Sequence, residues 1–229
     1  MHLVMFDIDG TLTETMKVDE ECFVRSFKDV FGFADIDTDW SHYPRTTDSG
    51  IFYDVFTSRT GRSPTTEEVS RFRRHFIQLL TAASSQSPFA PVAGADRLLS
   101  RLAQGSSHRV SLATGGWRDS ARLKMASAGM CFDDHPAASA DDALDGESIM
   151  RLSRQRAAER YRESFACTVY VGDGGWDARA CCSLGIPFIG IGTGSRAIQL
   201  SAEGAVCVFP DFSAPDIFFK SLYEITNAA

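Results

Sequence analysis

Residues 3–11 read LVMFDIDGT, an apolar strand that ends in two aspartates, Asp7 and Asp9, followed by Gly10. Because side chains alternate along a strand with a period of two, Asp7 and Asp9 lie on the same side. Two carboxylates this close repel each other unless a cation or a proton offsets their charge. Ligands of open α/β sheets bind at the carboxyl ends of the strands. A solvated acidic turn is the alternative, but the buried strand favours a charged site at its end.

Further short β-rich runs follow, and stretches of helical periodicity separate them. Strands are expected at 109–114, 168–173, 187–192 and 205–209, and helices at 94–104, 117–129, 148–162, 175–184 and 195–202. Most of the strand runs are continuously apolar, which is typical of strands covered on both faces. The alternation predicts an α/β fold with a doubly wound, mainly parallel sheet.

The segment 14–90 interrupts this alternation, where a βα loop would need only about 2–6 residues. Helical patterns cover 19–31, a shorter stretch from Asp48 to about Ser58, and 65–83. Thr65 and Glu68 form a capping box at the start of the last one. We expect 14–90 to be a small α-helical cap domain on a catalytic core made of 1–13 and 91–229.

Two other strand ends carry polar groups. Asp173 ends the run TVYVGD and Asp177 follows in GDGGWD, so further carboxylates meet Asp7 and Asp9 at the same sheet edge. Oxygen ligands without histidine suit Mg²⁺ and not Zn²⁺. A third run ends in Thr114-Gly115-Gly116, where a hydroxyl and backbone amides can bind a phosphate at a helix N-terminus.

Composition excludes several classes of protein. The 229 residues are 44% hydrophobic and 23% charged, which is typical of a globular chain. A net charge of −7 argues against generic binding to nucleic acid or to an anionic membrane. The sequence has no apolar run of about 20 residues and no recognisable signal peptide. Six scattered cysteines without a CxxC pair favour reduced thiols and a cytoplasmic location.

The motifs DIDGT at 7–11, LATGG at 112–116 and VGDGGWD at 171–177 resemble, in order and separation, those of the haloacid dehalogenase superfamily of phosphohydrolases. The predicted insert is similar to the helical cap of the subgroup that contains phosphoglycolate phosphatase and β-phosphoglucomutase. The resemblance covers nearly the whole chain and implies a Rossmann-like core.

The resemblance also implies roles for the site residues. Asp7 would be the nucleophile that forms an aspartyl phosphate, and Asp9 the general acid and base. Mg²⁺ would be held by Asp7, the backbone carbonyl of Asp9 and Asp173, with Asp177 acting through water or orienting the other ligands. The Thr114 hydroxyl and the backbone amides of Ile8, Asp9 and Gly115 would bind phosphoryl oxygens.

One family feature is missing, because the segment 138–157, which comes before the strand expected at 168–173, contains no lysine. Lys124, in the helix after Thr114, is the preferred phosphate-side cation, and Arg151 is the second choice. Arg45, in HYPRTTDSGI, is the candidate to bind an anionic group of the substrate. Trp117 and Trp176 follow two of the motifs and either line the mouth of the site or pack in the core.

These residues predict a Mg²⁺-dependent phosphatase acting on a small phosphorylated metabolite through an aspartyl phosphate. Within the resemblance, Asp9 argues against dehalogenase and phosphonatase chemistry. A sugar phosphomutase is the nearest alternative, and a non-catalytic phosphate-binding protein on the same fold is the other. The sequence does not identify the substrate or the oligomeric state.

Overall fold

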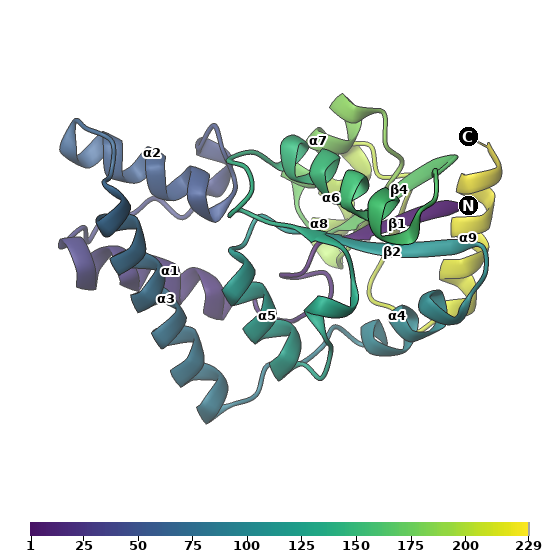
Figure 1. Cartoon of the computed structure of the whole chain (residues 1–229), viewed down its shortest axis with the longest axis horizontal. Helices are drawn as coiled ribbons and strands as arrows, with labels where there is room; N and C mark the ends of the chain where they lie inside the picture. The colour runs from purple at the N-terminus through teal and green to yellow at the C-terminus, as the bar shows by residue number, and fades with distance from the viewer. Residues whose placement is uncertain (229) are drawn as a thin grey trace.

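A parallel sheet forms the centre of the protein, for which the computed structural model describes residues 1–228 (Figure 1). The sheet has six strands in the order β3-β2-β1-β4-β5-β6, and every neighbouring pair is parallel. The strands are β1 (His2–Phe6), β2 (His108–Ala113), β3 (Ala137–Ala138), β4 (Cys167–Gly172), β5 (Phe188–Ile191) and β6 (Cys207–Phe209). The predicted α/β fold with a doubly wound, mainly parallel sheet is confirmed.

Helices cover both faces of this sheet. They are α4 (Ala95–Gln104), α5 (Arg118–Ser127), α6 (Gly146–Tyr161), α7 (Gly175–Leu184), α8 (Gly194–Ala202) and α9 (Pro215–Ala228). Along β1, Val4 and Phe6 belong to one apolar core, whereas Leu3 and Met5 belong to a second. The first core also receives side chains from α4, α5 and α9, and the second from α6, α7 and α8. The continuous apolar run of β1 is thus explained by burial on both faces.

Strand β3 and helix α9 have no counterpart in the sequence prediction. Strand β3 is only two residues long, too short for a periodic pattern, and pairs with the end of β2. Helix α9 buries Phe218 and Leu222 against the first core. Both lie outside the β-rich and helical runs that predicted the other elements.

The segment 14–90 is helical and lies beside the carboxyl end of the sheet (Figure 1). It contains α1 (Met16–Phe31), a short 3-10 helix η1 (Trp40–His42), α2 (Asp48–Thr60) and α3 (Thr66–Gln86). Helix α3 begins at the predicted capping box, in which both hydrogen bonds between Thr65 and Glu68 form. A core cluster of its own fills this helical segment, built mainly from Phe23, Phe27, Phe52, Phe72 and Phe76. The predicted division into a cap and a core domain stays a prediction.

Candidate active site

Three buried carboxylates meet at the end of the sheet. Asp7 follows β1, Asp173 follows the neighbouring strand β4, and Asp177 lies in the first turn of α7. Each offers one oxygen atom, and these atoms lie within 4.8 Å of one another. Parallel pairing of β1 and β4 therefore brings together side chains that are more than 160 residues apart in the sequence.

The environment of these three groups disfavours their charged forms. Burial raises the pKa of Asp7 well above its usual range, and the nearby charges of Asp177 and Asp173 add to this. The pKa of Asp173 is raised well above its usual range by burial and then by Asp177. Burial also raises the pKa of Asp177, to about 7. A cation bound among them would stabilise the charged carboxylates and so lower these pKa values.

The donor set fits Mg²⁺. Among the residues that the structure describes, the Oδ1 atom of Asp173 is buried without a hydrogen-bond partner. Only carboxylate oxygens converge here, and hard oxygen ligands are the ones that Mg²⁺ prefers. Asp177 is held by the backbone N–H of Gly174 at 3.1 Å, and the Tyr170 hydroxyl lies 3.2 Å from its other oxygen. These contacts fix the orientation of the Asp177 carboxylate next to Asp7 and Asp173.

Asp9 occupies a different environment from Asp7. Its Oδ1 atom accepts a hydrogen bond from the Thr15 hydroxyl at 2.5 Å, and its Oδ2 atom lies 2.6 Å from the ammonium nitrogen of Lys124. Gly10 turns the chain between this residue and Thr15 with a φ of 74°. A side chain at Gly10 would collide with the Asp173 carboxylate, so the close approach of the two motifs requires glycine.

Lys124 is the buried cation of the site. It lies on α5, and its ammonium group pairs with Asp9 and, at 2.5 Å, with Asp19 in the first turn of α1. Burial by itself would lower the pKa of Lys124, but the charges of Asp19 and Asp9 raise it above its usual value. Within the described chain, Lys124 makes no ion pair with Asp7. Arg151, the second choice from the sequence, is exposed on α6.

Thr114 follows β2, and its buried hydroxyl is suited to bind phosphate. The hydroxyl oxygen accepts a hydrogen bond from the Gly116 N–H at 3.1 Å, which leaves its own proton to donate. A methyl group at Gly116 would lie 3.4 Å from this oxygen and 3.6 Å from Oδ2 of Asp9. The Thr114 hydroxyl and the Asp9 carboxylate therefore face the same small space.

The start of α2 is bound directly to the strand-end loop after β2. The N–H of Asp48 donates to the carbonyl of Gly115 at 2.8 Å, and the Asp48 carboxylate accepts from the N–H of Trp117 at 2.9 Å. The Ser49 hydroxyl accepts from the Trp117 indole at 2.7 Å. The helical segment thus closes over one side of the strand ends.

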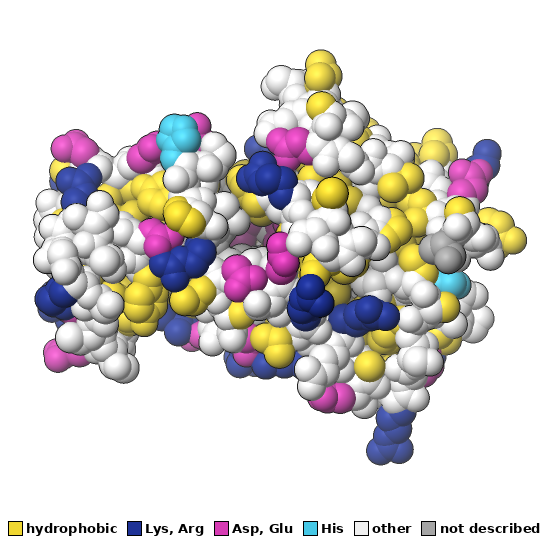
Figure 2. All heavy atoms as spheres, turned by 90° about the horizontal axis from the view of Figure 1, so that it is seen from above, with side chains coloured by type: hydrophobic (Ala, Val, Ile, Leu, Met, Phe, Trp, Pro, Cys, Tyr) yellow, Lys and Arg dark blue, Asp and Glu magenta, His cyan; other side chains and the backbone are white. Residues whose placement is uncertain are grey.

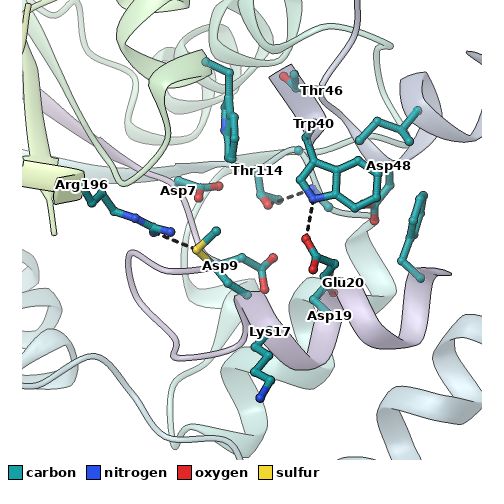
Figure 3. Close-up of a pocket in the computed structure, with 16 residues that line it drawn as sticks. Asp7, Asp9, Lys17, Asp19, Glu20, Trp40, Thr46, Asp48, Thr114 and Arg196 are labelled. Carbon is teal, nitrogen blue, oxygen red and sulfur yellow. Dashed lines mark hydrogen bonds between the residues drawn. The ribbon is translucent and has the colours of Figure 1, made fainter. Parts of the chain in front are cut away.

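A cavity of about 340 Å³ lies between the helical segment and the sheet. Asp7, Asp9 and Thr114 line one wall, and Figure 3 shows them facing side chains of the helical segment across the space. Figure 2 shows acidic side chains gathered on the surface at this junction. The predicted residues Asp7, Asp9, Thr114 and Gly115 therefore share one cavity.

Arg45, Trp117 and Trp176 differ in their positions relative to this cavity. Arg45 lines a neighbouring cavity of about 630 Å³, where its guanidinium forms an ion pair with Asp54. Trp117 is buried and packs among Phe23, Phe72 and Phe76. It is therefore a core residue and does not line the mouth of the site. Trp176 lines both cavities and has the role at the site mouth.

Several cavity residues were missed by the sequence analysis: Asp19, Glu20, Trp40, Asp48 as a lining residue, and Arg196. The Arg196 guanidinium forms an ion pair with Asp173 and lies 3.0 Å from the Met16 sulfur. Arg196 is in the first turns of α8, directly after β5, and this position at a strand end is the signal that could have found it. The residues of α1 and η1 carry no comparable signal, because only folding brings them over the sheet edge.

Comparison with known proteins identifies the family of the chain. Residues 1–185 match the family model of haloacid dehalogenase-like hydrolases. The chain belongs to this hydrolase family. The family resemblance of the three motifs is thereby confirmed, and the chain is an enzyme of the hydrolase class. The carboxylate cluster of this haloacid dehalogenase-like hydrolase could hold the metal that the family generally uses.

Solved structures share the fold of this haloacid dehalogenase-like hydrolase over nearly its whole length. A hydrolase from Pseudomonas syringae is 19% identical with a TM-score of 0.75, covering 98% of this chain and 99% of that one. A β-phosphoglucomutase candidate from Bacteroides vulgatus is 21% identical with a TM-score of 0.67, covering 100% and 89%. A predicted phosphoglycolate phosphatase from Haemophilus somnus is 18% identical with a TM-score of 0.62, covering 96% and 97%.

No curated protein matches the chain. Within residues 1–228, none of the helices has the length and apolar character needed to cross a membrane.

Proposed function

We propose that the protein is a Mg²⁺-dependent phosphatase that hydrolyses a small phosphomonoester by transferring its phosphoryl group to Asp7. The observation that carries the proposal is the pairing of two unlike carboxylates in one cavity. Asp7 is buried among other carboxylates, whereas Asp9 is held by Thr15 and Lys124. Mg²⁺ bound by Asp7, Asp173 and Asp177 would keep Asp7 in the charged form that attack on phosphorus requires. Asp9 lies outside this carboxylate group and is the candidate for proton transfer.

The first step is in-line attack of an Asp7 oxygen on phosphorus. The bond from phosphorus to the leaving oxygen breaks as Asp9, in its protonated form, donates its proton to that oxygen. In the second step Asp9 removes a proton from water, the water oxygen bonds to phosphorus, and the bond to Asp7 breaks. Inorganic phosphate and free Asp7 result, so both carboxyl groups return to their starting states.

The surrounding groups stabilise negative charge on the phosphoryl oxygens. The Thr114 hydroxyl has a proton to donate toward the space beside Asp9. Mg²⁺, when bound by Asp7, Asp173, the Asp9 carbonyl and the oriented Asp177, would offset the charge of the carboxylates and of the phosphoryl group. Lys124 contributes through Asp9, whose carboxylate it fixes.

The expected partner is a small phosphorylated metabolite, and neither nucleic acid nor a membrane is an expected partner. The cavity of about 340 Å³ suits a ligand of this size. A phosphomutase would use the same carboxylates but would return the phosphoryl group to the substrate intermediate. Phosphate release and isomer formation from β-glucose 1-phosphate therefore distinguish the two activities.

The test is a phosphate-release assay over a broad panel of phosphomonoesters, with p-nitrophenyl phosphate as the generic substrate. We expect turnover with Mg²⁺, loss of turnover with EDTA, and recovery when Mg²⁺ is restored. Restoration by Zn²⁺ alone would contradict the oxygen-ligand site. Absence of turnover over the whole panel would favour a phosphate-binding protein without catalysis.

A further inference from the structure

The cavity wall opposite Asp7 is acidic and aromatic. Glu20 and Asp48 line it together with Phe23, Trp40 and Ile51, all from the helical segment. In Figure 3, Glu20, Trp40 and Asp48 lie across the cavity from Asp7. The leaving group of a phosphomonoester bound to Asp7 would extend toward this wall. The indole N–H of Trp40 donates to one carboxylate oxygen of Glu20 at 3.0 Å, which fixes that carboxylate in the wall.

Among the described residues, no ion pair joins a cation to Glu20 or Asp48. Lys124 is buried against Asp9 and Asp19, and Arg196 lies on the Asp7 side of the cavity, opposite Glu20 and Asp48, in Figure 3. Lys17 lines the cavity, but its side chain is 91% exposed and its ammonium group extends away from Glu20 and Asp48 in Figure 3. Arg45, which the sequence suggested for an anionic substrate group, is paired with Asp54 in the neighbouring cavity.

This distribution of charge disfavours a leaving group with a second anion. Burial, followed by the charge of Asp19, raises the pKa of Asp48 well above its usual range, so an uncompensated negative charge is unfavourable in this wall. A substrate carboxylate or second phosphate would add to that repulsion. A protonated amine would relieve it by pairing with Glu20 or Asp48 and by lying against the Trp40 ring.

On the basis of the proposed phosphatase function, we infer that the substrate is a phosphomonoester whose leaving alcohol carries a protonated amine. Glu20 is the specificity residue of this inference, because its carboxylate lies on the wall and is oriented by Trp40. Asp48 lines the same wall, but its carboxylate accepts a hydrogen bond from the backbone N–H of Trp117, so it is less suited to mutational testing.

Three two-carbon phosphomonoesters that differ in terminal charge provide the test. They are 2-aminoethyl phosphate (cationic), 2-hydroxyethyl phosphate (neutral) and phosphoglycolate (anionic). We expect kcat/KM to be at least about tenfold higher for the amine than for the alcohol, the scale of one hydrogen bond to a charged group. Phosphoglycolate should be the poorest substrate. Equal values for the amine and the alcohol, or a preference for phosphoglycolate, would overturn the inference.

A matched pair of variants tests whether Glu20 causes the preference for the amine substrate. Glu20→Gln removes the charge but keeps an oxygen that can accept from Trp40, so the amine-to-alcohol ratio of kcat/KM should fall about tenfold. Glu21→Gln makes the same change of charge on the next residue of α1, whose side chain is 64% exposed, and should leave the ratio unchanged. An unchanged ratio in Glu20→Gln would remove Glu20 from this role.

Failure of the inference can be told apart from failure of the proposed function. Turnover of p-nitrophenyl phosphate that disappears in Asp7→Asn supports the phosphatase whatever the amine preference. If that turnover is present and the three substrates show no preference for the amine, only the inference fails. If p-nitrophenyl phosphate and the broad panel are both inert, the proposed function itself fails.

Discussion

The ammonium nitrogen of Lys124 lies 2.6 Å from Oδ2 of Asp9, and the Lys124 side chain has no exposed surface. The same nitrogen lies 2.5 Å from Oδ1 of Asp19, so one cation joins the strand-end motif to the first turn of α1. Lys124 therefore fixes the Asp9 carboxylate and at the same time holds the helical segment over the site.

Replacing Lys124 with methionine should lower stability as well as activity. The change leaves two mostly buried carboxylates without their cation, and breaking such a pair costs about 3–5 kcal/mol of unfolding free energy. Urea unfolding measures this loss. Lys28→Met, at an exposed position of α1, makes the same change of charge and should have little effect. Equal stability of Lys124→Met and the unmodified protein would contradict the ion-pair geometry.

Asp9→Asn should lose most turnover and keep most of its Mg²⁺ affinity. The amide cannot transfer the proton, and a positioned general acid or base typically contributes about 10²–10⁴-fold in rate. The proposed metal contact of Asp9 is its backbone carbonyl, which the substitution keeps. Steady-state kinetics and isothermal titration with Mg²⁺ measure the two effects separately. An equally large loss of Mg²⁺ binding would show that the Asp9 side chain is itself a ligand.

Stability without metal should fall as the pH rises. Burial raises the pKa of Asp177 to about 7 in the folded protein, whereas an unfolded Asp has a pKa of about 3.9. A group with a raised folded pKa stabilises the fold at low pH, and this contribution is lost as the pH rises through about 7. The raised pKa values of Asp7 and Asp173 act in the same direction.

Thermal unfolding in EDTA at pH 5 and pH 8 measures this dependence. The midpoint should be lower at pH 8, and Mg²⁺ should raise it more at pH 8 than at pH 5, because the metal binds the deprotonated carboxylates. Asp177→Asn should weaken the pH dependence in EDTA. A Mg²⁺ effect that is the same at both pH values would argue against binding at these carboxylates.

Arg196→Ala should strengthen Mg²⁺ binding. The guanidinium pairs with Asp173 and competes with a metal for that carboxylate. The Arg196 side chain is 43% exposed, so the pair is worth only about 0.2–1 kcal/mol, which corresponds to an increase in affinity of up to about fivefold. Mg²⁺ titration measures the change, and Arg97→Ala, at an exposed position of α4, is the control. Weaker Mg²⁺ binding in Arg196→Ala would show that this arginine supports the site instead.

The sheet and its strand-end carboxylates could be predicted because each depends on a local pattern. The apolar run before Asp7 and the polar groups after β2 and β4 are visible in the sequence, and parallel pairing brings them together. The wall opposite Asp7 could not be predicted in this way. Glu20, Trp40 and Asp48 become neighbours only because aromatic packing in the helical segment sets the positions of α1, η1 and α2.

Arg45 illustrates the limit of reasoning from a single residue type. In the sequence, Arg45 is a cation in a segment that is a candidate for substrate specificity. The residues next to it in the sequence do not show whether another side chain of the protein pairs with it. Asp54, nine residues later, lies within reach only because α2 brings the two side chains together. The charge available to a substrate therefore depends on packing, because Asp54 neutralises the cation that the sequence suggests.

The transfer of the phosphoryl group to Asp7 is the central claim, and chemical trapping tests it most directly. Borohydride reduces an aspartyl phosphate to homoserine, so the enzyme is quenched with borohydride during turnover of p-nitrophenyl phosphate and its peptides are analysed by mass spectrometry. We predict homoserine at position 7, only when substrate is present, and no turnover above a few per cent in Asp7→Asn. Phosphate release without modification at position 7, together with substantial activity in Asp7→Asn, would contradict the account.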